Sequence, residues 1–200
     1  MIEEDKNNKQ SIKSQRVKSY FIQAAKEIIM SEGVENVSVR KVAEKAGYAY
    51  TTIYNYFTDV NELLKAVKDV MIEDVMCHMQ GEMLGKVIDL EEIKRTNRAY
   101  VTYYIEHPHI FHFFYSYRLN PESTQPELPD FEKHWEITYG SFVEKGVIRM
   151  ADIGVIAKIM IYSIHGLLAL YFSDNGMKEE NLLEDLDSII NHLLGGKITV

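Results

Sequence analysis

The chain has 200 residues, of which 46% are hydrophobic and 26% are charged, and its formal net charge at pH 7 is -8. This length suits one or two domains, and the apolar fraction is typical of a globular protein that buries a core. The acidic total argues, at first sight, against a nucleic-acid partner, so the distribution of charge matters more than its sum.

Three features of the sequence indicate a cytoplasmic protein without a membrane segment. No run of about eighteen apolar residues occurs, which a membrane-spanning helix would need. The amino end is charged and polar and lacks the apolar core of a signal peptide. The single cysteine, Cys77, excludes an intrachain disulfide and fits a reducing compartment, and we expect it to be a small buried hydrophobe.

The first predicted helix runs from about Gln15 to Ser31, and Gly33 is expected to cap its C-terminal end. Its apolar residues recur every three or four positions, which predicts one buried face. They are Val17, Phe21, Ala24, Ala25 and Ile28.

Positive charge is concentrated near the amino end. Residues 1–60 hold nine Lys/Arg and eight Asp/Glu, whereas residues 61–200 hold thirteen and twenty-two. A basic arm that leads into a near-neutral domain is compatible with phosphate contacts, and a solvated tail is the alternative. The basic residues of this arm, with no acid between them, are Lys6, Lys9, Lys13, Arg16 and Lys18.

The stretch from Val37 to Phe57 has the pattern of two short helices joined by a tight turn. Ser38 can cap the first helix through its hydroxyl, and Gly47 stands where a left-handed residue would end it. Ile53 and Phe57, four residues apart, predict the buried face of the second helix, which we expect to reach about Phe57. This arrangement predicts a helix-turn-helix, whose second helix enters the major groove of DNA. The outer face of that helix is polar and aromatic and comprises Thr51, Thr52, Asn55 and Tyr56.

The same stretch resembles the DNA-reading segment of the TetR family of bacterial transcriptional regulators. The residues that carry the resemblance are Arg40, Val42-Ala43, Ala46-Gly47, Thr52-Ile53-Tyr54, Phe57 and Glu62-Leu63-Leu64. By this resemblance, the residues that meet bases or phosphates are Ser38, Arg40, Tyr50, Thr51, Thr52, Tyr54, Asn55 and Tyr56. Two positions depart from the family pattern: Val60 replaces a frequent phosphate-binding lysine, and Ala49 replaces a frequent capping serine.

The rest of the chain predicts an all-α protein of about nine helices with essentially no sheet. A helix capped by Asp59 should continue to about Met79, with Glu62 reaching back in a capping box. We expect a three-helix DNA-binding domain over residues 1–60, and the family resemblance implies an effector-binding and dimerisation domain over 61–200. The five further predicted helices are Leu90–Glu106, His109–Leu119, Phe131–Lys145, Ile153–Phe172 and Glu179–Leu194, with a proline-containing loop at 120–129.

The last two predicted helices indicate a homodimer. Their apolar residues cover more of each helix than a single core face requires. The excess can be buried against the same two helices of a second copy, as a two-fold four-helix bundle, which is also where the TetR family dimerises. The alternative is a monomer in which other helices of the same chain cover both apolar sides. DNA reading favours the dimer, because two helix-turn-helix domains can then bind successive half-sites.

Aromatic residues are spread over four helices of the second domain. A large solid core accounts for them, and so does an effector cavity, which the resemblance to the TetR family implies. We expect a neutral or weakly polar, largely apolar or aromatic effector, because no acid is placed convincingly among the aromatics. The predicted wall residues are Tyr103, Phe111, Phe114, Trp135, Tyr139 and His165.

No motif of metal binding or catalysis is evident. His107 and His109 flank Pro108 at a helix break, and their spacing with His112 matches no established zinc-binding pattern. The sequence also has no glycine-rich phosphate loop, nucleophile elbow or supported acid pair. We therefore expect no metal, no cofactor and no catalytic residue.

These patterns and the resemblance to the TetR family together predict a ligand-responsive transcriptional repressor that binds a palindromic operator as a homodimer. One alternative is a helical small-molecule-binding protein or scaffold with a vestigial DNA-reading head, which the missing lysine at Val60 favours. An enzyme or carrier built on the aromatic domain is a second alternative, and it lacks a catalytic constellation.

Overall fold

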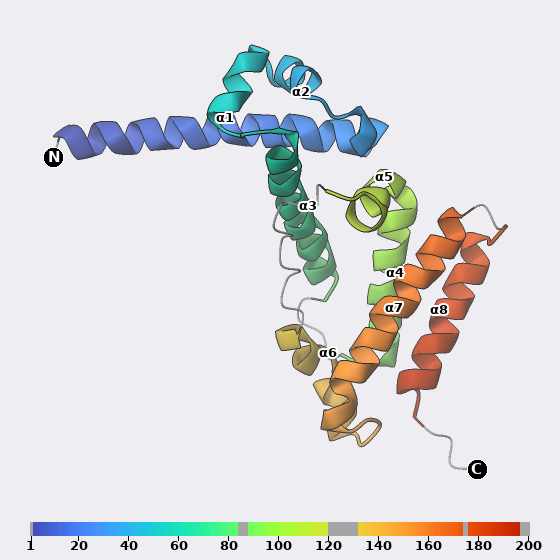
Figure 1. Ribbon diagram of the computed structural model, residues 1–200. Coiled ribbons are helices and arrows are strands. Elements are labelled where there is room, and N and C mark those ends of the chain that lie inside the picture. The colour runs from blue at the N-terminus through green and yellow to red at the C-terminus, as the bar shows by residue number, and fades with distance from the viewer. Residues whose placement is uncertain (1, 84–87, 120–131, 174–175, 197–200) are drawn as a thin grey trace. The chain divides into compact units, whose positions relative to one another are not determined.

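The protein is all-α in the part of the chain that the structure describes, as the sequence predicts. The computed structural model describes residues 2–83, 88–119, 132–173 and 176–196, except for the side chains of 2–11, 78, 80–83 and 132–136. Every regular element in these ranges is a helix (Figure 1). The chain forms two compact units: one contains the residues up to Val75 and the segment that begins at His109, and the other contains Met76–Pro108 and the helices from α6 onward. The predicted proline-containing loop at 120–129 lies outside the described residues.

The first unit begins with a long helix, α1 (Ile2–Glu32), which packs against α2 (Val39–Ala46). All five side chains of the predicted apolar face of α1 are buried, and Gly33 ends the helix with a φ of 89°. The short helix η1 (Val34–Asn36) then leads to α2. The predicted start at Gln15 was wrong, because α1 begins at Ile2. The residues before Gln15 are mostly polar, so they show no apolar period. Such a period marks only the part of a helix that packs on a core, and the first turns of α1 were therefore not predicted.

α3 (Val60–Met83) begins in the first unit and is longer than predicted. The Glu62 N–H donates to Asp59 Oδ1 at 2.9 Å, so Asp59 caps the helix as expected. The Glu62 carboxylate accepts from the N–H and the hydroxyl of Thr58, one residue before the cap. Cys77 is exposed on α3, so the prediction that it is buried was wrong.

The segment after α4 is divided into α5 (Pro108–Phe111) and a π-helix, η3 (His112–Ser116). The Tyr117 N–H donates to the His112 carbonyl at 2.9 Å, which is the five-residue spacing of a π-helix. A single helix from His109 to Leu119 was predicted instead. The wider turn separates three consecutive aromatic rings, of which Phe113 is fully buried.

The second unit contains α4 (Leu90–Glu106), α6 (Glu132–Glu144), the short η4 (Met150–Asp152), α7 (Ile153–Phe172) and α8 (Glu179–Leu194). The bounds of α4, α7 and α8 confirm the predicted ranges. α7 and α8 lie side by side, and both contact α4 (Figure 1). Arg98 on α4 forms a two-bond ion pair with Asp187 on α8, with 2.9 Å from Nε to Oδ1.

α7 is the most apolar helix of the chain. The segment Met150–Phe172 is long and apolar enough to cross a membrane by length and composition, and an 18-residue window within it has a mean hydropathy of 1.9. The search for an uninterrupted apolar run missed it because Lys158 and His165 interrupt the run. A core helix of a soluble protein meets the same test, and six α7 side chains, from Ile153 to Leu168, are buried in the second unit.

Candidate nucleic-acid interface and effector region

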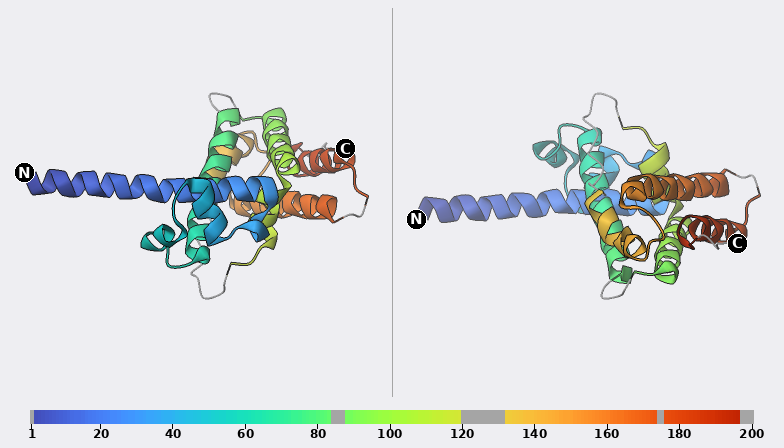
Figure 2. Two further views of the ribbon diagram at one scale, coloured as in Figure 1. Left: turned by 90° about the horizontal axis from the view of Figure 1, so that it is seen from above. Right: turned by 90° about the horizontal axis from the view of Figure 1, so that it is seen from below.

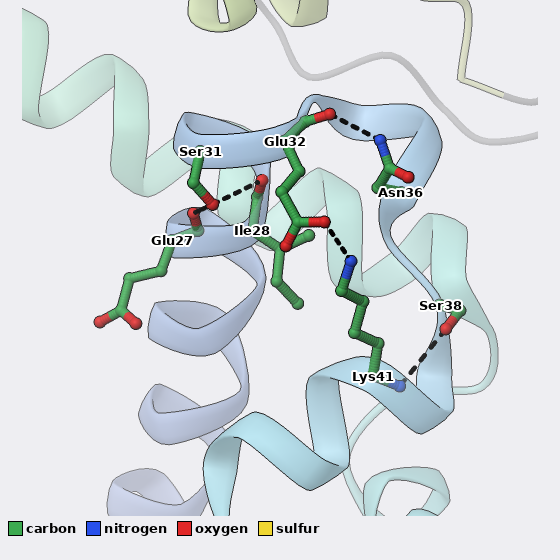
Figure 3. Close-up of polar contacts among 7 residues, drawn as sticks. All are labelled: Glu27, Ile28, Ser31, Glu32, Asn36, Ser38 and Lys41. Atoms are coloured by element: carbon green, nitrogen blue, oxygen red, sulfur yellow. Dashed lines mark hydrogen bonds and ion pairs between the residues drawn. The ribbon is translucent and has the colours of Figure 1, made fainter.

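The first helix of the helix-turn-helix is held by short-range contacts at both ends. Ser38 Oγ accepts the Lys41 N–H at 3.3 Å at the amino end (Figure 3). At the carboxyl end, Gly47 has a φ of 77°, and the Tyr48 N–H donates to the Ala43 carbonyl at 2.9 Å. These contacts confirm the predicted cap and the predicted positive φ, and they turn the chain sharply before the second helix.

The second helix of the motif is a 3-10 helix, η2 (Tyr50–Asn55), and not an α-helix that reaches Phe57. Ile53 and Phe57 are 2% and 3% exposed, so the predicted anchoring face is confirmed. The Thr52 N–H donates to the Ala49 carbonyl at 2.9 Å, which is the three-residue spacing of a 3-10 turn. η2 therefore presents a short, tightly wound surface.

Most of the predicted DNA-contacting side chains lie together on the outside of this motif. Tyr50 and Tyr54 are 51% and 54% exposed, which is unusual for aromatic rings in a small domain. The Arg40 guanidinium lies 5.7 Å from the centre of the Tyr50 ring, so α2 and η2 contribute to one surface. Ser38, Thr51 and Asn55 are exposed as well, and Thr52 is half-buried. Tyr56 is also half-buried, with its ring 5.8 Å from that of Phe21.

Several lysines of the first unit form ion pairs with acids of the same unit. Lys41 pairs with Glu32 (Figure 3), and Lys45 pairs with Glu27 at 2.9 Å. The hydrogen bond from Lys45 is the main reason that the pKa of Glu27 lies below its ordinary value. Exposed pairs of this kind contribute little to stability, but they place part of the positive charge of α2 against protein carboxylates.

The predicted effector residues are divided between the two units. Phe111 and Phe114 belong to the first unit, where Phe111 is 6% exposed. Lys68 Nζ lies 5.9 Å from the centre of the Phe114 ring and donates to the Phe114 carbonyl at 3.4 Å. Burial lowers the pKa of Lys68. A second link joins the π-helix to the turn after α1, because His112 Nε2 lies 2.7 Å from Glu35 Oε1.

Tyr103, Tyr139 and His165 belong to the second unit. His165 Nε2 lies 3.0 Å from the Tyr100 hydroxyl, and burial lowers the pKa of His165 from 6.5 to about 4. Burial also raises the pKa of Tyr139 to about 12. Both groups are therefore neutral near pH 7. Trp135 lies on α6, but its side chain is outside the described part of the structure.

Two residues of α4 near His165 were not among the predicted wall residues. Tyr100 is the partner of His165, and Thr96, one turn earlier, has a buried hydroxyl without a hydrogen-bond partner among the described atoms. Their four-residue spacing was the available signal, because it places both on one side of α4. The described residues contain no group of three His, Cys, Asp or Glu that could hold a metal ion.

Comparison with known proteins agrees with the helix-turn-helix geometry. Residues 21–67 match the family described as bacterial regulatory proteins, tetR family. The uncharacterised HTH-type transcriptional regulator YvdT of Bacillus subtilis (strain 168) is 31% identical over 65 residues, which are 32% of this chain and 34% of that protein. The match thus spans about a third of the length of YvdT.

The fold agrees over nearly the whole chain. A candidate TetR-family regulator from Syntrophomonas wolfei str. Goettingen has a TM-score of 0.66 at 18% identity, covering 93% of this chain and 98% of its own. The helix-turn-helix segment is therefore of the TetR type, and the chain shares the fold of solved TetR-family structures. RolR, in complex with the ligand resorcinol, is another TetR-like structure, with a TM-score of 0.62 at 18% identity and coverage of 92% and 90%.

The two departures from the TetR pattern have visible structural consequences. Ala49 precedes η2 and makes no side-chain hydrogen bond, so the first turn of η2 lacks the cap that a serine would supply. Val60 is half-buried at the start of α3 and brings no positive charge. The start of α3 is therefore less basic here than the TetR pattern leads one to expect.

Proposed function

We propose that this TetR-family protein is a ligand-responsive transcriptional repressor that binds a palindromic operator as a homodimer. The observation that carries this proposal is the exposed surface of η2 and α2, where Tyr50, Tyr54 and Asn55 stand beside Arg40. The opposite face of η2 is buried, so these side chains face solvent. Exposed aromatic and amide side chains in this position are suited to contact base edges and phosphates. The protein would act on DNA in the cytoplasm.

Each of these side chains has a distinct expected role. Asn55 can form two hydrogen bonds with an adenine edge, a contact worth about 1–3 kcal/mol of discrimination. The Tyr54 hydroxyl is suited to a phosphate, so its loss should weaken binding to all sequences alike. Arg40, held against the Tyr50 ring, can reach a guanine edge or a phosphate.

The homodimer is supported by the outer side of α7. Val155, Ile159, Tyr162 and Leu170 are 59%, 41%, 70% and 47% exposed, and the first three are spaced four and three residues apart. Such a stripe on one helix can pack against its own copy about a two-fold axis. Two heads held in this way would meet half-sites about 34–36 Å apart.

Effector binding is proposed for the second unit. Tyr100, Tyr139 and His165 combine apolar surface with neutral polar groups, which favours an uncharged, largely apolar or aromatic compound. The resorcinol complex of RolR, whose fold is shared, is consistent with a ligand of this class. An effector would release the protein from DNA if it binds more tightly to a conformation in which the two helix-turn-helix domains of the dimer are displaced. The size of this shift in population is set by its difference in affinity for the two conformations.

The segment after α4 connects the second unit, where we propose the effector binds, to the first unit with the helix-turn-helix. α4 ends at Glu106, and α5 begins two residues later at Pro108, after which the chain enters the first unit at His109. The π-helix that follows contacts Glu35 after α1 and Lys68 on α3 through His112 and Phe114. A change in α4 would therefore be passed along the chain to a segment that contacts both the turn after α1 and α3.

The experiment is selection of a bound sequence from a random duplex library, followed by titration of that duplex. The wild type should show selective binding to an inverted repeat, and a Thr52→Ala, Tyr54→Ala, Asn55→Ala triple variant should lose it. Asn181→Ala, an exposed change on α8, is the control and should bind like the wild type. A folded triple variant with unchanged affinity would refute the assignment. Addition of phenols, aromatic acids or lipophilic cations then tests effector release.

A further inference from the structure

The first half of α1 has a stripe of positive charge along one face. α1 begins at Ile2, whereas the first of its described side chains to be buried is Val17. All basic residues before Val17 are spaced three, four and three positions apart. Because an α-helix turns about 100° per residue, such positions share an arc of about 80°. These residues, called here the basic stripe, are Lys6, Lys9, Lys13 and Arg16.

The basic stripe leads to the turn of the helix-turn-helix. Tyr20 is the next position in the same series, four residues after Arg16, and it is 52% exposed. Its ring stacks on Tyr48 at 6.4 Å, and Tyr48 directly follows Gly47 at the turn. The stripe is therefore in register with the side of α1 that meets the turn before η2. Both figures show the first half of α1 extending past the helix-turn-helix without another described element of that unit beside it (Figures 1 and 2).

The composition of the extension favours a polyanion over a lipid surface. The positions opposite the stripe include Asn8, Ser11 and Gln15, so the extension has no apolar face to insert into a bilayer. The acids of the extension all precede Lys6, in the first turn, where the helix dipole favours them. Lys13 and Arg16, whose side chains the structure describes, are both exposed.

The rest of the helix-turn-helix domain has few lysines that are not already in ion pairs or replaced. Lys26, Lys41 and Lys45 are paired with Asp74, Glu32 and Glu27, and Val60 stands where the family pattern has a lysine. An acidic protein must gather positive charge locally to bind a phosphate backbone. The basic stripe is such a local gathering of positive charge, on the helix whose Tyr20 stacks on Tyr48 at the turn before η2.

We propose that the first half of α1 lies along the sugar–phosphate backbone next to each half-site, with the basic stripe contacting phosphates. This inference rests on the proposed function, and it adds a second, sequence-independent contact surface to the helix-turn-helix. The stripe from Lys6 to Arg16 is about 15 Å long, which corresponds to about four base pairs. Phosphate contacts position the protein, so the stripe supplies affinity and leaves base selectivity to η2.

Two variants of the full chain test this inference. The neutralised variant carries Gln at all four stripe positions. The register variant keeps the charge and composition but moves three charges to the opposite face. Its substitutions are Lys6→Asn with Asn8→Lys, Lys9→Ser with Ser11→Lys, and Arg16→Gln with Gln15→Arg.

The measurement is the affinity for the selected operator and for an unrelated duplex of equal length, each titrated over a range of KCl concentrations. The logarithm of affinity should fall less steeply with salt in the neutralised variant, by about 0.9 for each phosphate that the stripe no longer neutralises. Affinity for both duplexes should fall together, by more than about ten-fold at 100 mM salt, so that their ratio is unchanged. The register variant should behave like the neutralised one. Both should unfold at the wild-type temperature, because the described stripe residues, Lys13 and Arg16, are exposed.

The outcomes separate this inference from the proposed function. Wild-type affinity and salt slope in the register variant would mean that the charge acts only at long range, and this would overturn the inference. Wild-type behaviour of both variants would identify the extension as a solvated tail, and binding of the stripe to anionic phospholipid vesicles instead would assign it to a membrane surface. In either case selective operator binding would survive. A wild type that binds no duplex selectively would refute the proposed function itself.

Discussion

Replacing His165 with glutamine should remove an acid-sensitive weakness of the second unit. Burial lowers the pKa of His165 from 6.5 to about 4, so the folded protein keeps this imidazole neutral while the unfolded chain takes up a proton near pH 6.5. The contribution of neutral His165 to the free energy of unfolding is therefore fully present above pH 6.5, and it is lost as the pH falls from 6.5 towards 4. At pH 5 the two pKa values correspond to a loss of at most about 2 kcal/mol.

The assay is urea unfolding of the wild type and of His165→Gln at pH 7 and pH 5, at one protein concentration. A glutamine amide can occupy the place of Nε2, which lies 3.0 Å from the Tyr100 hydroxyl, so the variant should keep the hydrogen bond. The variant should therefore lose less stability than the wild type between the two pH values. His192→Gln is the matched control, because His192 is exposed on α8 in the same unit.

The comparison cancels the contribution of the histidines that none of the three proteins has replaced. Equal losses of stability in the wild type and in His165→Gln would refute the reasoning, since they would show that His165 is protonated as easily in the folded as in the unfolded chain. A loss that His192→Gln relieves to the same extent would place the effect on the protein's net charge instead.

Two further predictions concern the turn and the dimer. Gly47→Ala should lower stability by about 1–2 kcal/mol in thermal unfolding, because φ is 77° there although a Cβ atom would meet nothing within 4 Å; Gly140→Ala in α6, where φ is not positive, should not destabilise. Tyr162→Glu should shift the protein towards a monomer in sedimentation, because Tyr162 is 70% exposed on the proposed α7 interface. A Tyr162→Glu protein that remains dimeric would contradict that interface.

The sequence predicts best those elements whose signals are local. The bounds of α4, α7 and α8 are confirmed because each has a strong apolar period and a clear stop, such as the restriction that Pro108 places on His107. The turn at Gly47 is likewise confirmed, since a left-handed residue after a short helix is a feature of the chain itself. Burial of Ile53 and Phe57 follows from their spacing.

The sequence fails where distant contacts decide. The π-helix from His112 to Ser116 is held by Glu35 and Lys68, and neither contact has a signature near residue 112. The pairing of Tyr100 with His165 joins residues 65 positions apart on two helices. The 3-10 winding of η2 was not predicted either, because the spacing of Ile53 and Phe57 marks a buried face without fixing the type of helix.

α7 illustrates why composition alone is ambiguous. A membrane-spanning helix is apolar all round, a core helix is buried all round, and an interface helix is apolar on two sides of which only one is buried within its own unit. α7 has a buried side from Ile153 to Leu168 and an exposed apolar side at Val155, Ile159 and Tyr162. Lys158 is exposed between these residues, and a lysine near the middle of a bilayer would be costly. Burial of the three exposed side chains against a second copy would stabilise the pair by about 1.5–3 kcal/mol for each large side chain fully removed from water. The third description therefore fits α7 best, and it makes the most apolar helix of the chain the element that would hold the two heads at a fixed separation.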